Sequence, residues 1–345
     1  MSNYLKRFTT LQEYTNFLES DDFVTPNVSY VEELDENDNH VHITRETYKF
    51  GDILMWDNVN KFKFGATVNL YTTKFKNNSQ YIPVGVCVIG TGLLDNYARF
   101  ICIKGQTTKM WSTNVGATAN SSTDFIYYDT TVLTNFTKIR SLGTGASVLS
   151  NSSQTSSTSR NGYARIPIER TDSNFNTVSD ENSNLRWYVE TDSSAYYTRS
   201  LYNQNWTLNS WHFDNLGSDD YFNDRDGYSN TDKLFTHSGV IYSGKSISFP
   251  AAEYCKTYSE YNNYGISTGR MYLPSITELS LGLCRYKSIN DILLQITDAQ
   301  PLVSNSYWSS TEYSAYSAAR FYTNYGYIYS NYKYFAGYVR PFFRL

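Results

Sequence analysis

The sequence predicts an α+β fold, and three observations lead to this class. Aromatic residues make up 17% of the 345 residues and charged residues only 18%, a composition typical of a folded, strand-rich chain. Strand-like patterns occur early, with alternation at 61–64 and an apolar run at 84–89. Two helix starts, with Pro250 and Pro274 in their first turns, precede a strand-rich C-terminus. Helices followed by a separate group of strands indicate α+β rather than alternating α/β.

The chain divides into three predicted segments. Residues 1–45 form a short module, in which a capping box at 10–13 opens a helix and an acidic turn at 35–39 joins two strands. Residues 46–135 are expected to form a small β-barrel or sandwich. Residues 136–345 form the largest segment, which begins with a Ser/Thr/Asn-rich stretch typical of a loop or linker.

Charge and hydropathy exclude several classes of partner. The net charge of -4 and the absence of a basic cluster argue against nucleic acid. No apolar run reaches the ~18 residues of a membrane span, so no membrane insertion is expected. Residues 1–7 lack the apolar core of a signal peptide, which predicts synthesis in the cytosol. The four cysteines lie far apart without a C-x-x-C spacing and are expected to be buried free thiols: Cys87, Cys102, Cys255 and Cys284.

Residues that could serve catalysis or bind a metal are few. His40 and His42 share one strand face and could supply two ligands, but no third ligand is indicated, so a solvated strand end is favoured. The stretch from Asp219 to Asp226 gathers oxygen ligands before a glycine, but the EF-hand register puts Phe222 at its first ligand position. An acidic surface loop is favoured there, and cation binding stays open. With no catalytic motif in the chain, we expect no enzyme activity, no cofactor and no metal.

Tyrosine is concentrated at the C-terminal end, where residues 307–345 hold ten of the 33 tyrosines, set singly among Ser, Asn, Ala and Gly. This mixture is typical of evolved binding surfaces, because the tyrosine ring is rigid and amphipathic. A Tyr-rich sheet whose rings pack on one another is the alternative. If the strand is regular, Tyr325, Tyr327 and Tyr329 share one face, which favours an exposed row of rings.

Four stretches carry a resemblance to a known family: 272–279 (YLPSITEL), 307–312 (YWSSTE), 326–327 (GY) and 338–341 (YVRP). They resemble the C-terminal domain of variable proteins of diversity-generating retroelements. That family has a C-type lectin fold related to the formylglycine-generating enzyme and includes tropism determinants on phage tail tips. The N-terminal residues 4–30 are similar, more weakly, to a short module of tail-associated phage proteins. The resemblance implies a C-terminal C-type lectin-like domain, with residues 1–45 serving tail attachment or oligomerisation.

The resemblance also implies which residues vary. In this family a reverse transcriptase mutates template adenines, and the affected codons never come to encode Trp, Glu, Lys, Met or Gln. In a variable region at about 307–338, Trp308, Glu312 and Lys333 would therefore be fixed scaffold. The strand that follows, with Val339, Arg340 and Pro341, would belong to the same scaffold. The positions that the rule permits to vary, and which would contact ligand, are Tyr307, Tyr313, Ser314, Tyr316, Arg320, Tyr322, Asn324, Tyr325, Tyr327, Tyr329, Asn331, Tyr332, Tyr334 and Phe335.

The function implied is that of a hypervariable receptor-binding protein, or adhesin, of a bacteriophage. It would be located in the virion, at a tail tip or fibre assembled in the host cytoplasm, and would form a homotrimer. Its partners would be a bacterial surface protein or glycan and other phage tail proteins. The calcium and disulfides of lectin-type relatives are not expected here, because Cys255 and Cys284 lie in separate predicted helices.

Three alternative functions stay open. A carbohydrate-binding module of fixed specificity would use Tyr and Trp to stack on sugar rings. A purely structural virion protein would need the C-terminal region for assembly but not for host range. An enzyme of the formylglycine-generating fold is disfavoured, because that activity uses cysteines near the C-terminal end and none follows Cys284.

Overall fold

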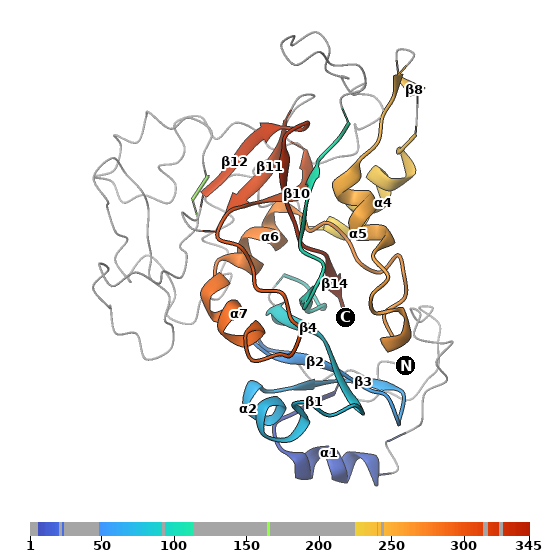
Figure 1. Cartoon of the computed structure of the whole chain (residues 1–345), viewed down its shortest axis with the longest axis vertical. Helices are drawn as coiled ribbons and strands as arrows, with labels where there is room; N and C mark the ends of the chain where they lie inside the picture. Colours follow the sequence, from blue (N-terminus) through green and yellow to red (C-terminus); the bar gives the residue numbers. More distant parts are fainter. Residues whose placement is uncertain are drawn as a thin grey trace, which may run out of the picture.

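The computed structural model has a mixed α+β architecture, with two six-stranded sheets and several helices (Figure 1). The α+β prediction is therefore confirmed. The structure describes residues 6–20, 23, 48–91, 94–113, 164–165, 225–239, 241–242, 245–312, 317–323 and 327–345. The predicted strands around the acidic turn at 35–39, His40 and His42, and most of the Asp219 to Asp226 stretch lie outside these residues.

The first sheet contains most of the strands predicted before residue 111. Its order is β1-β3-β2-β4-β5-β14, and only the β1–β3 pair is parallel. The strands are β1 (Lys6–Phe8), β2 (Ile53–Asp57), β3 (Phe62–Ala66), β4 (Tyr81–Ile89), β5 (Arg99–Cys102) and β14 (Phe342–Arg344). Tyr14 and Phe17 of helix α1 (Leu11–Leu18) pack on Phe62 and Phe64, which explains why β3 is buried although its sequence alternates.

The second sheet holds the Tyr-rich C-terminal region. Its order is β6-β13-β10-β11-β12-β7, with β10 parallel to β13 and the other pairs antiparallel. The strands are β6 (Thr107–Met110), β7 (Ala164–Arg165), β10 (Ser306–Glu312), β11 (Ser317–Tyr322), β12 (Tyr327–Tyr332) and β13 (Ala336–Val339). The strand β10 lies between β13 and β11 and is buried at every position.

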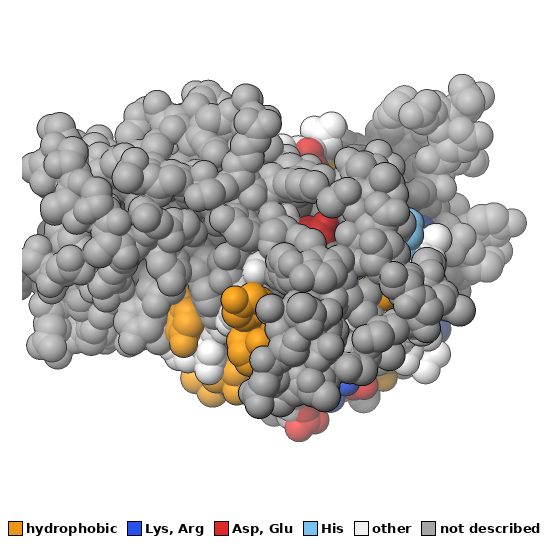
Figure 2. All heavy atoms as spheres, turned by 90° about the horizontal axis from the view of Figure 1, so that it is seen from above, with side chains coloured by type: hydrophobic (Ala, Val, Ile, Leu, Met, Phe, Trp, Pro, Cys, Tyr) orange, Lys and Arg blue, Asp and Glu red, His pale blue; other side chains and the backbone are white. Residues whose placement is uncertain are grey.

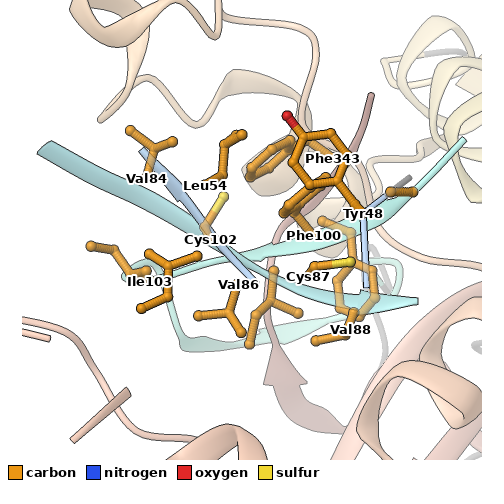
Figure 3. Close-up of a cluster of buried hydrophobic side chains, with 14 of the residues drawn as sticks. Tyr48, Leu54, Val84, Val86, Cys87, Val88, Phe100, Cys102, Ile103 and Phe343 are labelled. Atoms are coloured by element: carbon orange, nitrogen blue, oxygen red, sulfur yellow. The ribbon is translucent and has the colours of Figure 1, made fainter. Parts of the chain in front are cut away.

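The two sheets share the chain at two crossings, because β5 leads into β6 and β13 leads into β14. The C-terminal strand β14 thereby completes the first sheet beside β5, and the Phe100 and Phe343 rings stack with centroids 5.3 Å apart (Figure 3). Residue 136 itself lies outside the described residues. The predicted division there does not separate two independent sheets, since strands from both sides of it pair in each sheet and contribute to one core.

The helices begin largely where the sequence places them. Thr10 and Glu13 form the predicted capping box of α1, and Pro250 occupies the first turn of α5 (Pro250–Thr257). The prediction for Pro274 is wrong: it precedes the N-cap of α6 (Ile276–Leu283), where the Ser275 hydroxyl accepts from Glu278 N. The remaining helical elements are α2 (Val68–Leu70), a π-helix (Tyr71–Phe75), α4 (Gly227–Thr236), a 3-10 turn (Asn262–Tyr264) and α7 (Tyr286–Leu293), and a small hairpin consists of β8 (Ile241–Tyr242) and β9 (Lys245–Ser246).

All four cysteines are free and buried, as predicted. Burial raises the pKa of each of the Cys87, Cys102 and Cys255 thiols, which keeps them neutral. Among the helices that the structure describes, none combines the length and the apolar character that crossing a bilayer would require.

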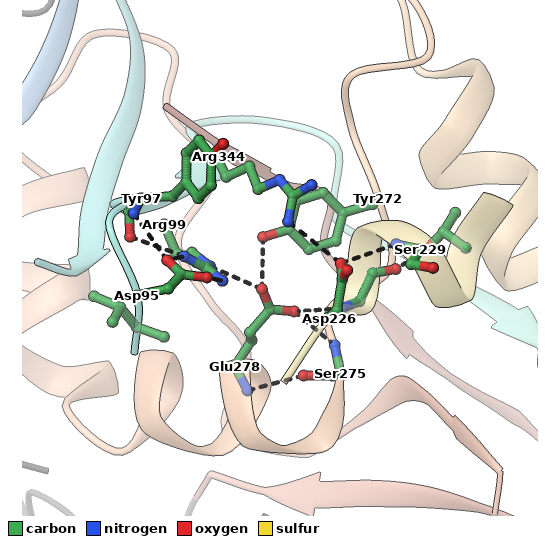
Figure 4. Close-up of polar contacts among 12 residues, drawn as sticks. Asp95, Tyr97, Arg99, Asp226, Ser229, Tyr272, Ser275, Glu278 and Arg344 are labelled. Atoms are coloured by element: carbon green, nitrogen blue, oxygen red, sulfur yellow. Dashed lines mark hydrogen bonds and ion pairs between the residues drawn. The ribbon is translucent and has the colours of Figure 1, made fainter. Parts of the chain in front are cut away.

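The buried carboxylate of Glu278 connects α6 to strand β5 and to the start of α4 (Figure 4). Glu278 Oε1 accepts from Arg99 Nε of β5 at 2.8 Å and from the Tyr272 hydroxyl at 3.0 Å. Its other oxygen accepts from Gly227 N, at the start of α4, at 2.9 Å and from Ser275 N at 3.0 Å. Both partners of the Arg99–Glu278 ion pair have side chains that are 0% exposed. One side chain therefore fixes α4, α6 and the first sheet relative to one another.

A second buried charge gives stability a pH dependence. Burial, with a smaller effect of Arg270, lowers the pKa of Lys63 to about 7, and its Nζ donates to Gly265 O at 2.9 Å. In the unfolded chain a lysine titrates near ~10.4. Between these values the unfolded state binds more protons, so Lys63 makes stability rise with pH by up to about 1.4 kcal/mol per unit.

Replacing Lys63 with methionine is expected to remove this contribution and to raise stability at pH 7. The measurement is urea unfolding of both proteins at pH 7, 8 and 9, where the advantage of K63M should shrink by about 2 kcal/mol between the extremes. The exposed Lys76→Met variant should follow the wild type at each pH. An advantage of K63M that stays constant with pH would contradict the prediction.

Candidate ligand-binding surface

The predicted contact residues are divided by the structure into three groups. Those outside the described residues are Tyr313, Ser314, Tyr316, Asn324 and Tyr325. Tyr327 and Tyr329 lie in β12, where only the backbone is described. For the remainder, Tyr332 (48% exposed) and Phe335 (44%) are exposed, Tyr322, Asn331 and Tyr334 are half-buried, and Tyr307 (0%) and Arg320 (4%) are buried.

The exposed aromatic residues lie on one turn between β12 and β13, which we call the aromatic turn (residues 332–335). The Tyr332 and Tyr334 rings are stacked with centroids 5.6 Å apart, and the Phe335 ring lies 4.3 Å from Tyr334 and 6.0 Å from Tyr332. The three rings thus form a continuous surface rather than isolated side chains. Figure 2 views the molecule from the end at which β10, β11 and β12 lie in Figure 1, and hydrophobic side chains reach the surface there in groups.

Lys333, between these rings in sequence, points inward and is 3% exposed. Its ammonium group pairs with Glu312, at the end of β10, and lies 4.7 Å from the centroid of the Trp111 ring. Its carbonyl oxygen accepts from Trp111 N at 2.9 Å and from Ser112 N at 3.2 Å. Lys333 thus turns inward, whereas Tyr332 before it is exposed and Tyr334 after it is half-buried.

Arg320 holds the other side of the aromatic turn, which corrects its prediction as a contact residue. Its guanidinium lies 3.5 Å from the centroid of the Trp308 ring, and Nη2 donates to Phe335 O at 3.0 Å and Ala336 O at 3.1 Å. The Trp308 indole in turn donates to Lys109 O at 3.0 Å. A side chain at Gly337 would come within 2.7 Å of Arg320, so only glycine allows this close approach. The pairing of Arg320 opposite Trp308 across β10 and β11 explains its burial, and sequence alone does not give that register.

Tyr307 also belongs to the interior, and its prediction as a contact residue is corrected in the same way. Its hydroxyl accepts from Val303 N at 2.8 Å and bonds to the Gln106 side chain, while its ring packs on Tyr338 with centroids 5.6 Å apart. Burial raises the pKa of the Tyr307 hydroxyl, so the group stays protonated. Both faces of β10 are covered: Tyr307 packs in the main core, and Trp308 in a smaller core with Trp111.

The six predicted scaffold residues are all buried: Trp308, Glu312, Lys333, Val339, Arg340 and Pro341. The charged side chains nearest the aromatic turn have partners in the interior. Lys333 pairs with Glu312, and Arg320 donates to backbone carbonyl oxygens. The described part of the aromatic turn therefore offers an uncharged aromatic surface.

The described residues contain no candidate metal site, since no three His, Cys, Asp or Glu side chains among them are grouped so that they could hold an ion. Asp226, the last residue of the predicted acidic loop, has a structural contact instead. Its carboxylate accepts from Ser229 N at 3.0 Å as the N-cap of α4 and from Arg344 at 3.3 Å (Figure 4).

Comparison with known proteins gives little further information. No protein-family model matches the chain, and no curated protein matches it significantly in sequence. Among solved structures, the chain is similar to a fimbrial protein from Bacteroides ovatus, with 13% sequence identity and a TM-score of 0.39. The similarity covers 86% of this chain and 48% of the fimbrial protein, so the chain spans about half the length of that structure.

Proposed function

We propose that the chain is a hypervariable receptor-binding protein of a bacteriophage tail, which contacts a bacterial surface protein or glycan through its aromatic turn. The observation that supports this most directly is the alternation within the turn. Tyr332, Tyr334 and Phe335 carry the accessible rings, whereas Lys333 carries the contacts that hold the backbone. A turn built in this way tolerates exchange of its outward side chains, because the hydrogen bonds accepted by the backbone oxygens of Lys333, Phe335 and Ala336 do not use those side chains.

The proposal includes a C-type lectin-like fold for the C-terminal region and variation at about 307–338, both of which rest on the sequence resemblance. The burial of Tyr307 and Arg320 narrows the proposed contact set. Its described members are Tyr332, Tyr334 and Phe335, with Asn331 next to Tyr332 in β12. Tyr322 lies apart from them, at the opposite end of β11, where it pairs with Tyr327. A homotrimer within the virion would present three copies of this surface, and repetition would strengthen weak individual contacts through avidity.

Sequencing the same gene from sibling phages tests the variability directly. Substitutions should be concentrated between residues 307 and 338 and should include Tyr332, Tyr334 and Phe335. Trp308, Glu312 and Lys333 should stay unchanged. A nearby reverse transcriptase gene and a near-copy of the 3′ end that differs at adenines should accompany the gene. Substitutions spread evenly along the gene would overturn the proposal.

Exchanging an exposed ring is expected to weaken binding to host cells without unfolding the protein. Tyr332→Ser and Phe335→Ser should each reduce affinity by about 1 to 2 kcal/mol, or roughly 5- to 30-fold, if the ring is buried against the receptor. The measurement is binding of purified protein to bacteria of the host strain, with thermal unfolding run in parallel. Tyr97→Ser is the matched control, because Tyr97 is 39% exposed and packs near Arg344 of the first sheet. Equal losses in all three variants would contradict the assignment.

A carbohydrate-binding module of fixed specificity is the second candidate, and the uncharged ring surface favours it. Aromatic faces of this kind stack on the apolar faces of sugar rings. A glycan array probed with several natural variants separates the two functions. One shared glycan across variants would favour the module, whereas a different or absent glycan for each variant would favour the hypervariable receptor-binding protein.

A further inference from the structure

Arg340 is a buried cation at the crossing from the second sheet to the first. It follows β13 and precedes β14, and its side chain is fully enclosed, with the residue 1% exposed. Nε donates to Cys102 O, at the end of β5, at 2.8 Å. The two terminal nitrogens, Nη1 and Nη2, find no hydrogen-bond acceptor among the described residues. Of the five N–H donors of Arg340, the four on its terminal nitrogens are therefore unused at the point where the sheets meet.

Among the residues that the structure describes, none gives Arg340 an ion pair. The groups that act on it most strongly are the Cys102 thiol and the hydroxyls of Tyr307, Tyr261 and Tyr258. Burial raises the pKa of Cys102 to about 12 and also raises the pKa of the three tyrosines, so all four groups are neutral at pH 7. An arginine does not lose its proton in a protein, and an isolated buried charge is costly. A counter-charge from outside the chain would remove this cost.

Two of the tyrosine hydroxyls that act on Arg340 are themselves not used as donors among the described residues. The Tyr261 oxygen accepts from Lys104 N at 3.2 Å, and within the described part of the chain its own proton is not used in a hydrogen bond. The Tyr258 ring lies beside Tyr261, with centroids 6.1 Å apart, and its hydroxyl proton is likewise unused there. A guanidinium group only donates, so the two unpartnered terminal nitrogens of Arg340 would suit an anion rather than a cation or an apolar molecule.

We propose that Arg340 binds a small monovalent anion of the halide type at the junction of the two sheets, through its two unpartnered terminal nitrogens. One positive charge in an enclosed position matches a single negative charge, and the terminal nitrogens give the directional contacts. The bound anion stabilises the folded chain, because the unfolded chain has no such site. This site is separate from the aromatic turn and does not depend on the proposed function.

Crystals of the full chain grown with sodium bromide test the site directly. The expected result is an anomalous bromide peak within hydrogen-bond distance of Nη1 and Nη2. A well-defined water molecule in that position, or density explained by protein atoms alone, would overturn the proposal.

In solution, halide should stabilise the wild-type chain at constant ionic strength. Replacing sodium gluconate with sodium chloride or bromide should raise the midpoint of thermal unfolding by about 2 °C or more. Arg340→Met keeps an unbranched apolar stem, removes the guanidinium and its charge, and should abolish the halide effect. Arg344→Met removes a nearby cation that already contacts Asp226 and should retain it. A halide effect of equal size in the R340M variant, or none in the wild type, would refute the site.

Discussion

Replacing Glu278 with alanine is expected to destabilise the protein by about 3 to 5 kcal/mol, because it removes one partner of a fully buried ion pair. Arg99 would keep its contact to Asp95 but lose the carboxylate that is enclosed with it. The backbone N–H groups of Gly227 and Ser275 would lose their acceptor in the interior. The loss should appear as a lower midpoint in urea unfolding followed by tryptophan fluorescence.

Two further variants separate the buried charge from the loss of volume. Glu278→Gln keeps the size of the side chain but places an amide donor near the N–H groups of Gly227 and Ser275, or next to Arg99, so it should be destabilised almost as strongly. Glu260→Ala removes a carboxylate whose pair with Lys104 lies at the surface, with side chains 45% and 38% exposed, and should cost less than about 1 kcal/mol. A loss in E278Q no larger than that in E260A would show that the ion pair does not hold the fold together.

The sequence predicts the local elements of this fold well but not the partners of its strands. The capping box at Thr10 and the helix start at Pro250 depend on neighbouring residues, and both are found in the structure. The pairing of β14 with β5 depends on residues far apart in the chain. An apolar pair such as Phe342 and Phe343 indicates a buried strand without indicating which sheet it joins. The two crossings between the sheets therefore could not be predicted.

The sequence also predicts the candidate ligand-binding surface only in part. The codon rule of the family that the sequence resembles would give the positions permitted to vary, but exposure depends on the packing of the second sheet. Tyr307 is permitted and yet buried, because β10 is covered on both faces. Arg320 is permitted and yet buried, because the register places it opposite Trp308. Lys333 was expected to be a fixed residue. Its ion pair with Glu312 turns it inward, whereas Tyr332 before it is exposed. This pairing is visible only in the folded structure.

Trp308 should be as sensitive to substitution as Glu278, because it supports the aromatic turn from within. Trp308→Ala is expected to cost about 3 to 5 kcal/mol of stability, the usual range for removing a buried aromatic ring. The change removes the face on which the Arg320 guanidinium lies and the donor to Lys109 O. Arg320 would then hold the carbonyls of Phe335 and Ala336 less firmly, so the proposed binding to host cells should fall together with stability.

A graded series distinguishes this supporting function from direct contact with a ligand. Trp308→Phe keeps an aromatic face for Arg320 but loses the indole donor, so its stability should lie between those of the wild type and W308A. Tyr332→Ala, on the exposed side of the aromatic turn, should cost about 1 kcal/mol of stability or less and still weaken binding. Urea unfolding and host-cell binding measured on the same preparations would compare the two properties. If W308A weakened binding while unfolding at the wild-type midpoint, Trp308 would be a contact residue and the division between buried frame and exposed rings would be wrong.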